Sequence, residues 1–100
     1  MGAVEDRLAA LGLTVQDVVP PVAAYVPAVR TGSYVYTSGQ LPFVDGVLQE
    51  TGKVGAEVTP ERAAELAQLC ALNAIAAVKS VVPLDTVVRV VKVVGFVASA

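Results

Sequence analysis

The sequence predicts an α+β fold in which one helix packs on one face of a β-sheet. Three observations lead to it: a hairpin pattern at residues 26–37, a long helical segment at residues 59–82, and a valine-rich segment at residues 86–97. A hairpin, then a helix, then a further strand is the order expected for a sheet that carries its helix on one side. The other face of that sheet is left without a cover from the chain itself.

The first 27 residues predict a short helix and an irregular connection. Apolar residues at 4, 8 and 11 have helical spacing, acidic residues occupy the first turn, and Gly12 stands where a helix C-cap is expected. Residues 13–27 carry Pro20, Pro21 and Pro27, which prevent a continuous helix or a central strand.

The hairpin is the clearest β signal. Residues 26–30 and 34–37 flank Thr31-Gly32-Ser33, where glycine can adopt a positive φ. The second strand ends at Ser38-Gly39-Gln40, and Pro42 stops the ladder. A turn-rich segment with Asp45-Gly46 follows at residues 43–53.

The long helix begins at Thr59-Pro60-Glu61, which supplies an N-cap, a proline at the first helical position and an early acid. It should end near residue 82, before Pro83. One face consists of small or short residues suited to close packing on a sheet: Ala63, Ala67, Cys70, Ala74 and Val78.

The last predicted element is a strand at residues 86–97. Its run of valines predicts burial on both faces. Arg89 and Lys92 are three residues apart, so strict alternation puts them on opposite faces unless a β-bulge lies between them.

Composition excludes several classes of protein. The 100 residues suit one domain, residues 1–100, and the net charge of −2 leaves no basic stripe for nucleic acid. One Cys and no His exclude an intrachain disulfide, a zinc site of N and S ligands, and Ser–His or Cys–His catalysis. No segment reaches the ~18 apolar residues of a membrane span. We expect a cytoplasmic protein that binds no metal, no membrane and no nucleic acid.

Sixty of the 100 residues are apolar or glycine, against a typical ~45–50%. A domain of this size has too little interior to bury them all. The surplus therefore covers a subunit interface, or part of the fold that covers it is missing.

Two features at the end of the hairpin carry the candidate chemistry: Tyr25 and the run Ser38-Gly39-Gln40. In one interpretation the hydroxyls cap local backbone groups and Tyr25 is ordinary packing. In the other they form the floor of a pocket, with the Gly39 N–H and the Tyr25 phenol facing a small ligand.

Residues 29–42, preceded by Tyr25, resemble the N-terminal signature of the Rid family, the RidA/YjgF-like reactive-intermediate deaminases. In that family a tyrosine precedes a hairpin that ends in a Ser-Gly-Gln-hydrophobic-Pro run. The similarity continues through the long helix, where Asn73 falls where the family often has an asparagine, and into the valine-rich strand. The N-terminal helix and Pro20-Pro21 resemble a bacterial subgroup.

The resemblance implies a chorismate-mutase-like mixed sheet, a homotrimer, and clefts between subunits. It also implies hydrolysis of enamines and imines such as 2-aminoacrylate to a keto acid and ammonia, without a cofactor. Tyr25, Ser38, Gly39 and Gln40 are the expected substrate-binding residues, and the catalytic residues stay unassigned.

One departure from the family leaves alternatives open. The family's pocket arginine and acid come from later strands, and Arg30, Arg62 and Arg89 fall at no matching position. The sequence therefore resembles the first two-thirds of a family member: a truncated or cleaved form, or a paralogue without the reaction. A non-catalytic trimer that binds a small metabolite in the same cleft, or serves a regulatory role, is the alternative function.

Overall fold

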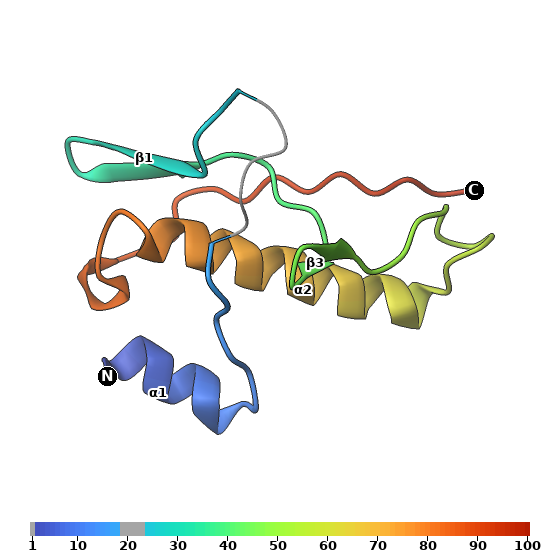
Figure 1. The fold of residues 1–100 in the computed structure, drawn as a ribbon, viewed down its shortest axis with the longest axis horizontal. Helices are drawn as coiled ribbons and strands as arrows, with labels where there is room; N and C mark the ends of the chain where they lie inside the picture. The colour runs from blue at the N-terminus through green and yellow to red at the C-terminus, as the bar shows by residue number, and fades with distance from the viewer. Residues whose placement is uncertain (1, 19–23) are drawn as a thin grey trace.

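The computed structural model describes residues 2–18 and 24–100, so the predicted effect of Pro20 and Pro21 lies outside the described residues. The elements are α1 (Ala3–Ala10), β1 (Ala28–Thr31), β2 (Tyr34–Thr37), β3 (Phe43–Val44), β4 (Val47–Leu48), α2 (Pro60–Lys79) and the 3-10 helix η1 (Leu84–Thr86). Figure 1 shows α2 as the central element, with the β1–β2 hairpin on one side and α1 on the other. The predicted α+β class is confirmed.

The strands form two separate antiparallel pairs in the described part of the chain. In the first, Ala28 pairs with Thr37 and Thr31 with Tyr34, across a turn in which Gly32 has φ +57°. In the second, Asp45 and Gly46 both have positive φ, 50° and 77°, as a tight Asp-Gly hairpin turn requires. The predicted hairpin and Asp-Gly turn are confirmed.

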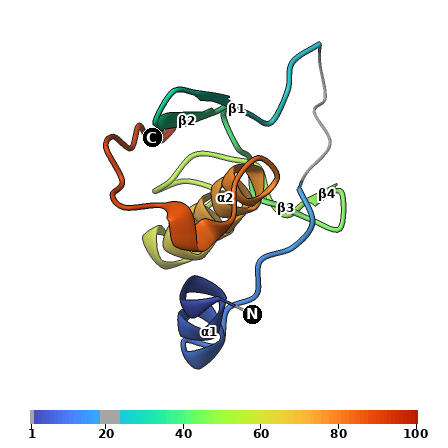
Figure 2. The same cartoon turned by 90° about the vertical axis from the view of Figure 1, so that its left-hand side faces the viewer.

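Helix α2 begins where the sequence predicts. Thr59 is the N-cap, its hydroxyl oxygen accepts a hydrogen bond from the Arg62 N–H at 3.1 Å, and Pro60 is the first helical residue. The helix ends at Lys79 rather than near residue 82, because residues 80–82 turn before Pro83. Figure 2, in which α2 is seen nearly end-on, shows the hairpin above it and α1 below.

The prediction of the buried face of α2 was wrong. The helix buries Leu72, Asn73, Ala76 and Ala77, whereas the small-residue face is half-buried or exposed, with Ala67 exposed. Strands β2 and β3 and the 3-10 helix η1 contact α2, and the described residues leave the small-residue face only partly covered. The small core comprises Ala28, Val58, Leu72, Ala76, Ala77, Val82 and Leu84.

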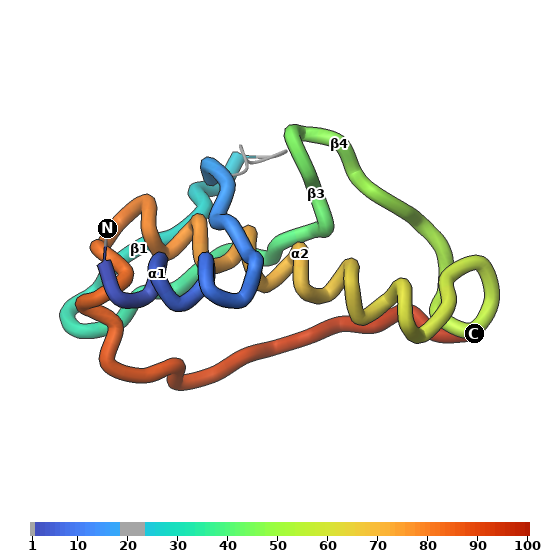
Figure 3. Tube along the Cα trace, turned by 90° about the horizontal axis from the view of Figure 1, so that it is seen from below, coloured from blue at the N-terminus to red at the C-terminus, as the bar shows by residue number. Residues whose placement is uncertain are grey.

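The predicted strand at residues 86–97 is not formed in the described part of the chain. Leu84–Thr86 is a 3-10 helix, and the residues after it are extended but have no ladder partner until the chain reaches Val54. The Val54 N–H donates to the Ala98 carbonyl at 2.9 Å, and the Ala100 N–H donates to the Val54 carbonyl at 3.0 Å. Figure 3 shows this segment running back along α2 from one end to the other.

The predicted burial of this segment on both faces was also wrong. Residues 87–97 are exposed, with Val88 at 99% and Phe96 at 95%. Without a ladder there is also no β-bulge between Arg89 and Lys92. The valine pattern indicates a strand that needs neighbours, and the described residues supply none.

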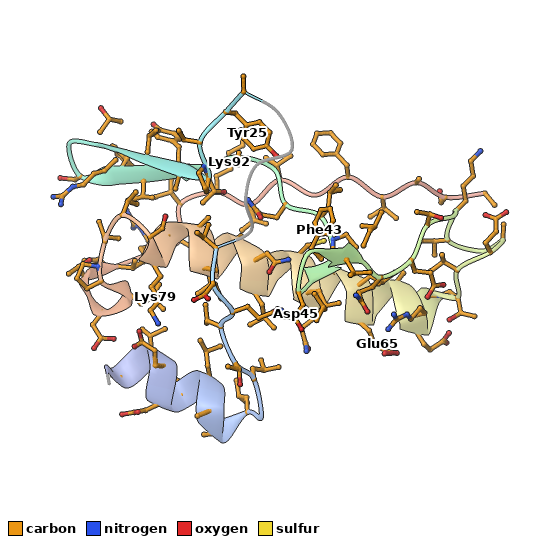
Figure 4. All side chains as sticks on the ribbon, in the orientation of Figure 1. Tyr25, Phe43, Asp45, Glu65, Lys79 and Lys92 are labelled. Atoms are coloured by element: carbon orange, nitrogen blue, oxygen red, sulfur yellow. The ribbon has the colours of Figure 1, made fainter. Side chains whose placement is uncertain are left out.

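Helix α1 is held by polar contacts with η1 and α2. The Asp85 carboxylate accepts hydrogen bonds from the N–H groups of Ala3 at 2.9 Å and Val4 at 3.0 Å, and so caps the helix N-terminus. Glu5 Oε1 lies 3.7 Å from Lys79 Nζ, and Figure 4 shows Lys79 directed toward α1. At the other end Gly12, with φ +75°, closes the helix as predicted.

Candidate functional site

The end of strand β2 is tied back to the residue that leads into β1. The Ser38 N–H and the Ser38 hydroxyl both donate to the Pro27 carbonyl, at 2.9 and 3.2 Å. Tyr25 stands two residues before Pro27, so the hairpin brings Tyr25 and the run from Ser38 to Gln40 to the same end of the sheet. Figure 4 shows Tyr25 on the segment that enters the hairpin. The four predicted site residues thus come from two neighbouring stretches of backbone.

Two consecutive backbone N–H groups at this strand end have no hydrogen-bond partner in the part of the chain that the structure describes. Among the described residues, no group accepts a hydrogen bond from the N–H of Gly39 or of Gln40. Gly39 is exposed, and a Cβ built on it would meet no atom within 4 Å. Gln40 is half-buried, and its side-chain amide makes a long 3.4 Å contact to the Ser38 carbonyl. Adjacent free N–H groups of this kind suit an anionic or carbonyl oxygen.

Tyr25 is suited to act as a hydrogen-bond donor. Its side chain is 40% exposed, and its hydroxyl has no hydrogen-bond partner within residues 2–18 and 24–100. The phenol can donate to a ligand and accept from one. The Ser38 hydroxyl donates its hydrogen bond to the Pro27 carbonyl, and its oxygen can still accept one.

On the other side of the free N–H groups the chain is fixed by a buried asparagine of α2. Asn73 Nδ2 donates to the Leu41 carbonyl at 3.0 Å and to the Phe43 carbonyl at 3.1 Å. Sequence reasoning noted Asn73 only as a match to a family position and missed this role. The available signal was a polar residue in the middle of an otherwise apolar helical segment.

The remaining polar clusters lie away from this strand end. Arg62 Nε lies 2.9 Å from Glu50 Oε1, and this hydrogen bond raises the pKa of Arg62. Burial raises the pKa of the Cys70 thiol on α2, in accord with an unreactive packing residue. Within the described ranges, no group of three or more His, Cys, Asp or Glu side chains is placed to hold a metal ion.

Comparison with known proteins identifies the family. The model of the family described as "YjgF/chorismate mutase-like, putative endoribonuclease" matches residues 5–98. The chain belongs to this YjgF/chorismate mutase-like family. The Rid resemblance drawn from the hairpin signature is thereby confirmed.

Three relatives illustrate the extent of the similarity. Protein TCP17 of Trypanosoma cruzi is 35% identical over 100 residues, which are 99% of this chain and 62% of that protein. A crystal structure of a putative endoribonuclease from Shewanella oneidensis MR-1 matches with a TM-score of 0.74 and 37% identity, over 79% of this chain and 52% of its own. The protein Atu1372 of unknown function from Agrobacterium tumefaciens matches with a TM-score of 0.63 and 42% identity, over 77% of this chain and 45% of its own.

The chain thus spans 45% to 62% of the length of these YjgF-like relatives. They come from two bacteria and a trypanosome, so they do not assign the chain to bacteria. Among the described residues, no helix has both the length and the apolar character needed to cross a bilayer.

Two parts of this YjgF-like chain expose many apolar side chains. The outward face of the β1–β2 hairpin presents Val29, Tyr34 and Tyr36, each about half exposed, and the two tyrosine rings lie 6.3 Å apart. Residues 87–97 expose a run of valines and Phe96. Exposed apolar side chains in this number are typical of a protein contact.

Two stretches of the chain carry positive charges and no negative ones. Residues 24–44 and 86–100 contain Arg30, Arg89 and Lys92 and no Asp or Glu, although the whole chain has a net charge of −2. The acidic residues lie in α1, in the segment that follows it, in the loops around β3 and β4 and before α2, on α2, and in η1, where Asp85 directly precedes the second stretch. A potential of this sign favours an anionic ligand over a cationic one.

Proposed function

We propose that the chain acts as a RidA-like hydrolase of reactive enamines and imines of the 2-aminoacrylate type, releasing a keto acid and ammonia. The proposal is supported by the strand end itself: the N–H groups of Gly39 and Gln40 have no hydrogen-bond partner among the described residues, and the Ser38–Pro27 hydrogen bonds bring this strand end beside the backbone segment that carries Tyr25. The proposal extends to a homotrimer whose clefts lie between subunits and to a location in the cytoplasm. It requires no cofactor.

The reaction needs little from the protein. The enamine is protonated at carbon and becomes an imine. Water then adds to the imine carbon, and the resulting carbinolamine expels ammonia and leaves a ketone. The free N–H groups suit the substrate carboxylate or the oxygen developing at the reacting carbon, where a preorganised donor is most effective. The Tyr25 phenol is able to relay a proton to the departing nitrogen.

The charge and apolar surface support this assignment. An enamine acid such as 2-aminoacrylate carries a carboxylate, which the acid-free region around Arg30, Arg89 and Lys92 would attract. A neighbouring subunit that covers residues 87–97 would also exclude water from the strand end and strengthen the hydrogen bonds there.

A test follows the release of ammonia from freshly generated 2-aminoacrylate with and without the protein. We expect faster release with the wild type and a loss of roughly tenfold or more in Tyr25→Phe, which removes only a hydroxyl. Thr51→Val, which removes an exposed hydroxyl from a distant loop, serves as the matched control and should keep the wild-type rate. Release no faster than in buffer alone would reject the enzymatic proposal.

A non-catalytic protein that binds a small metabolite at the same place is the second candidate. It is favoured by one observation: none of Tyr25, Ser38, Gly39 and Gln40 carries a charged side chain that could activate water. Saturable binding of pyruvate, the keto-acid product, together with no release of ammonia would decide for this candidate.

RNA cleavage is named in the description of the family and of the Shewanella relative. The net charge of −2 argues against it. A protein that neutralises many phosphates needs a cationic surface with more side chains than Arg30, Arg89 and Lys92. An affinity for RNA that falls steeply with salt would reverse that judgement.

A further inference from the structure

Asn73 is the one polar side chain that is buried among the described residues. It is 1% exposed and is the largest fully buried side chain of the described residues. Both protons of its amide are used, one on the Leu41 carbonyl at 3.0 Å and the other on the Phe43 carbonyl at 3.1 Å. The bonds span 32 and 30 positions, from the middle of α2 to Leu41 in the loop after β2 and to Phe43 at the start of β3.

A polar side chain at this place is costly unless it performs a task that an apolar one cannot. Burying an amide forfeits its hydration, and the bonds that it regains are worth little more than those it loses. A leucine has the same number of side-chain heavy atoms, branched at the same carbon, and would suit the apolar face that holds Leu72, Ala76 and Ala77. Helix packing alone therefore does not require an asparagine here. What the amide adds is a fixed position for two carbonyls.

Those two carbonyls lie just beyond the candidate site. Ser38 fixes the chain on one side through the Pro27 carbonyl, and Asn73 fixes it on the other through Leu41 and Phe43. Between these two attachments stand Gly39 and Gln40, whose N–H groups are free among the described residues. Gly39 has no side chain to hold it, so its orientation depends on the two attachments.

We propose that Asn73 is a positioning residue, which holds the backbone at Leu41 and Phe43 against α2 and thereby orients the Gly39 and Gln40 N–H groups toward the substrate. The role of Asn73 in substrate binding rests on the proposed function, whereas the order parameters that test it can be measured without any activity. If the attachment is removed, the glycine samples many orientations, and only the fraction with both N–H groups convergent binds the ligand. The apparent affinity falls by that fraction.

The test compares Asn73→Leu with Leu72→Ala by ¹⁵N relaxation and by titration with pyruvate. Leu72 is the neighbouring buried residue of α2, and its truncation weakens the core without touching the loop carbonyls. We expect the order parameters of the Gly39 and Gln40 amides to fall from the rigid range, about 0.85, to below about 0.6 in Asn73→Leu only. The dissociation constant for pyruvate should rise about tenfold in that variant and stay near the wild-type value in Leu72→Ala.

Equal order parameters at Gly39 and Gln40 in the two variants would overturn the proposal, because Asn73 would then contribute only stability. Should Asn73→Leu not fold, Asn73→Ser takes its place, and its one hydroxyl donor should give intermediate order parameters. If the wild type neither binds pyruvate nor releases ammonia, the proposed function fails, whereas the order parameters still decide whether Asn73 positions the strand end.

Discussion

Replacement of Phe96 by aspartate tests whether a second subunit covers the exposed apolar segment. The Phe96 side chain is 95% exposed, so it adds almost nothing to the core of its own chain. A surface substitution of this kind changes the free energy of unfolding by no more than about 0.5 kcal/mol. In the proposed homotrimer the same side chain is buried, which is worth about 1.5–3 kcal/mol of association free energy.

At about 1.4 kcal/mol for each factor of ten, the loss of that burial weakens association by roughly tenfold to a hundredfold. A carboxylate left in the interface weakens it further. Phe96→Asp should therefore dissociate at protein concentrations at which the wild type is assembled, while both melt at the same temperature once the effect of assembly is removed.

Sedimentation velocity over a range of concentrations measures this difference. Thr51→Asp, which places the same charge on an exposed polar loop, is the matched control and should sediment like the wild type. A wild type that sediments as a monomer at every concentration, or a Phe96→Asp variant that assembles as well as the wild type, would refute the argument from the exposed surface.

Two further predictions concern the ionisable groups of the helices. The N–H groups of Val4 and Ala3 lower the pKa of Asp85, so the folded pKa lies below the unfolded one. The stability from this contact is then fully present above the unfolded pKa, about 3.9, and is lost as the pH falls through the folded pKa. In the wild type the Val4 amide signal should shift to its undocked position only as the pH falls below the unfolded pKa and through the lower folded one, whereas in Asp85→Ala it should be shifted already at pH 6; an unchanged signal in the variant would contradict the capping role. Burial raises the pKa of Cys70, so iodoacetamide should alkylate the folded protein at pH 8 more slowly than the urea-unfolded chain, and equal rates would be evidence against a packed thiol.

The elements that could be predicted from the sequence are those whose information is local. Thr59 and Pro60 define the start of α2 because an N-cap and a first-turn proline act within one turn of helix. Gly32 and the Asp45-Gly46 pair define two hairpins because positive φ is a property of a single residue. Neither inference depends on where the rest of the chain lies.

The wrong predictions concern features that depend on contacts between residues far apart in the sequence. The small residues of α2 predicted one buried face, but the chain packs its loops on the face that holds Asn73 and Ala77. The valines of residues 87–97 correctly indicate extended backbone, but a strand becomes a strand only when another pairs with it. The composition of this segment indicates that it needs a neighbouring strand, but it does not show which strand that is.

The candidate site was predicted only in part for a related reason. Tyr25, Ser38, Gly39 and Gln40 could be selected because they flank a recognisable hairpin, and they stay a prediction of the binding site. The attachment of the strand end by Asn73 joins residues thirty positions apart in the sequence. Spacing along one chain cannot reveal a partner at that separation.

The contact between Val54 and the residues around Ser99 has a consequence for how the chain folds. Helix α2 and the hairpins close through near neighbours, which is rapid, whereas this contact closes a loop that contains all of α2. The entropy of closing so long a loop is lost before any of its few hydrogen bonds is gained. The last residues should therefore dock late in folding and open first in native-state hydrogen exchange, with the helix still intact.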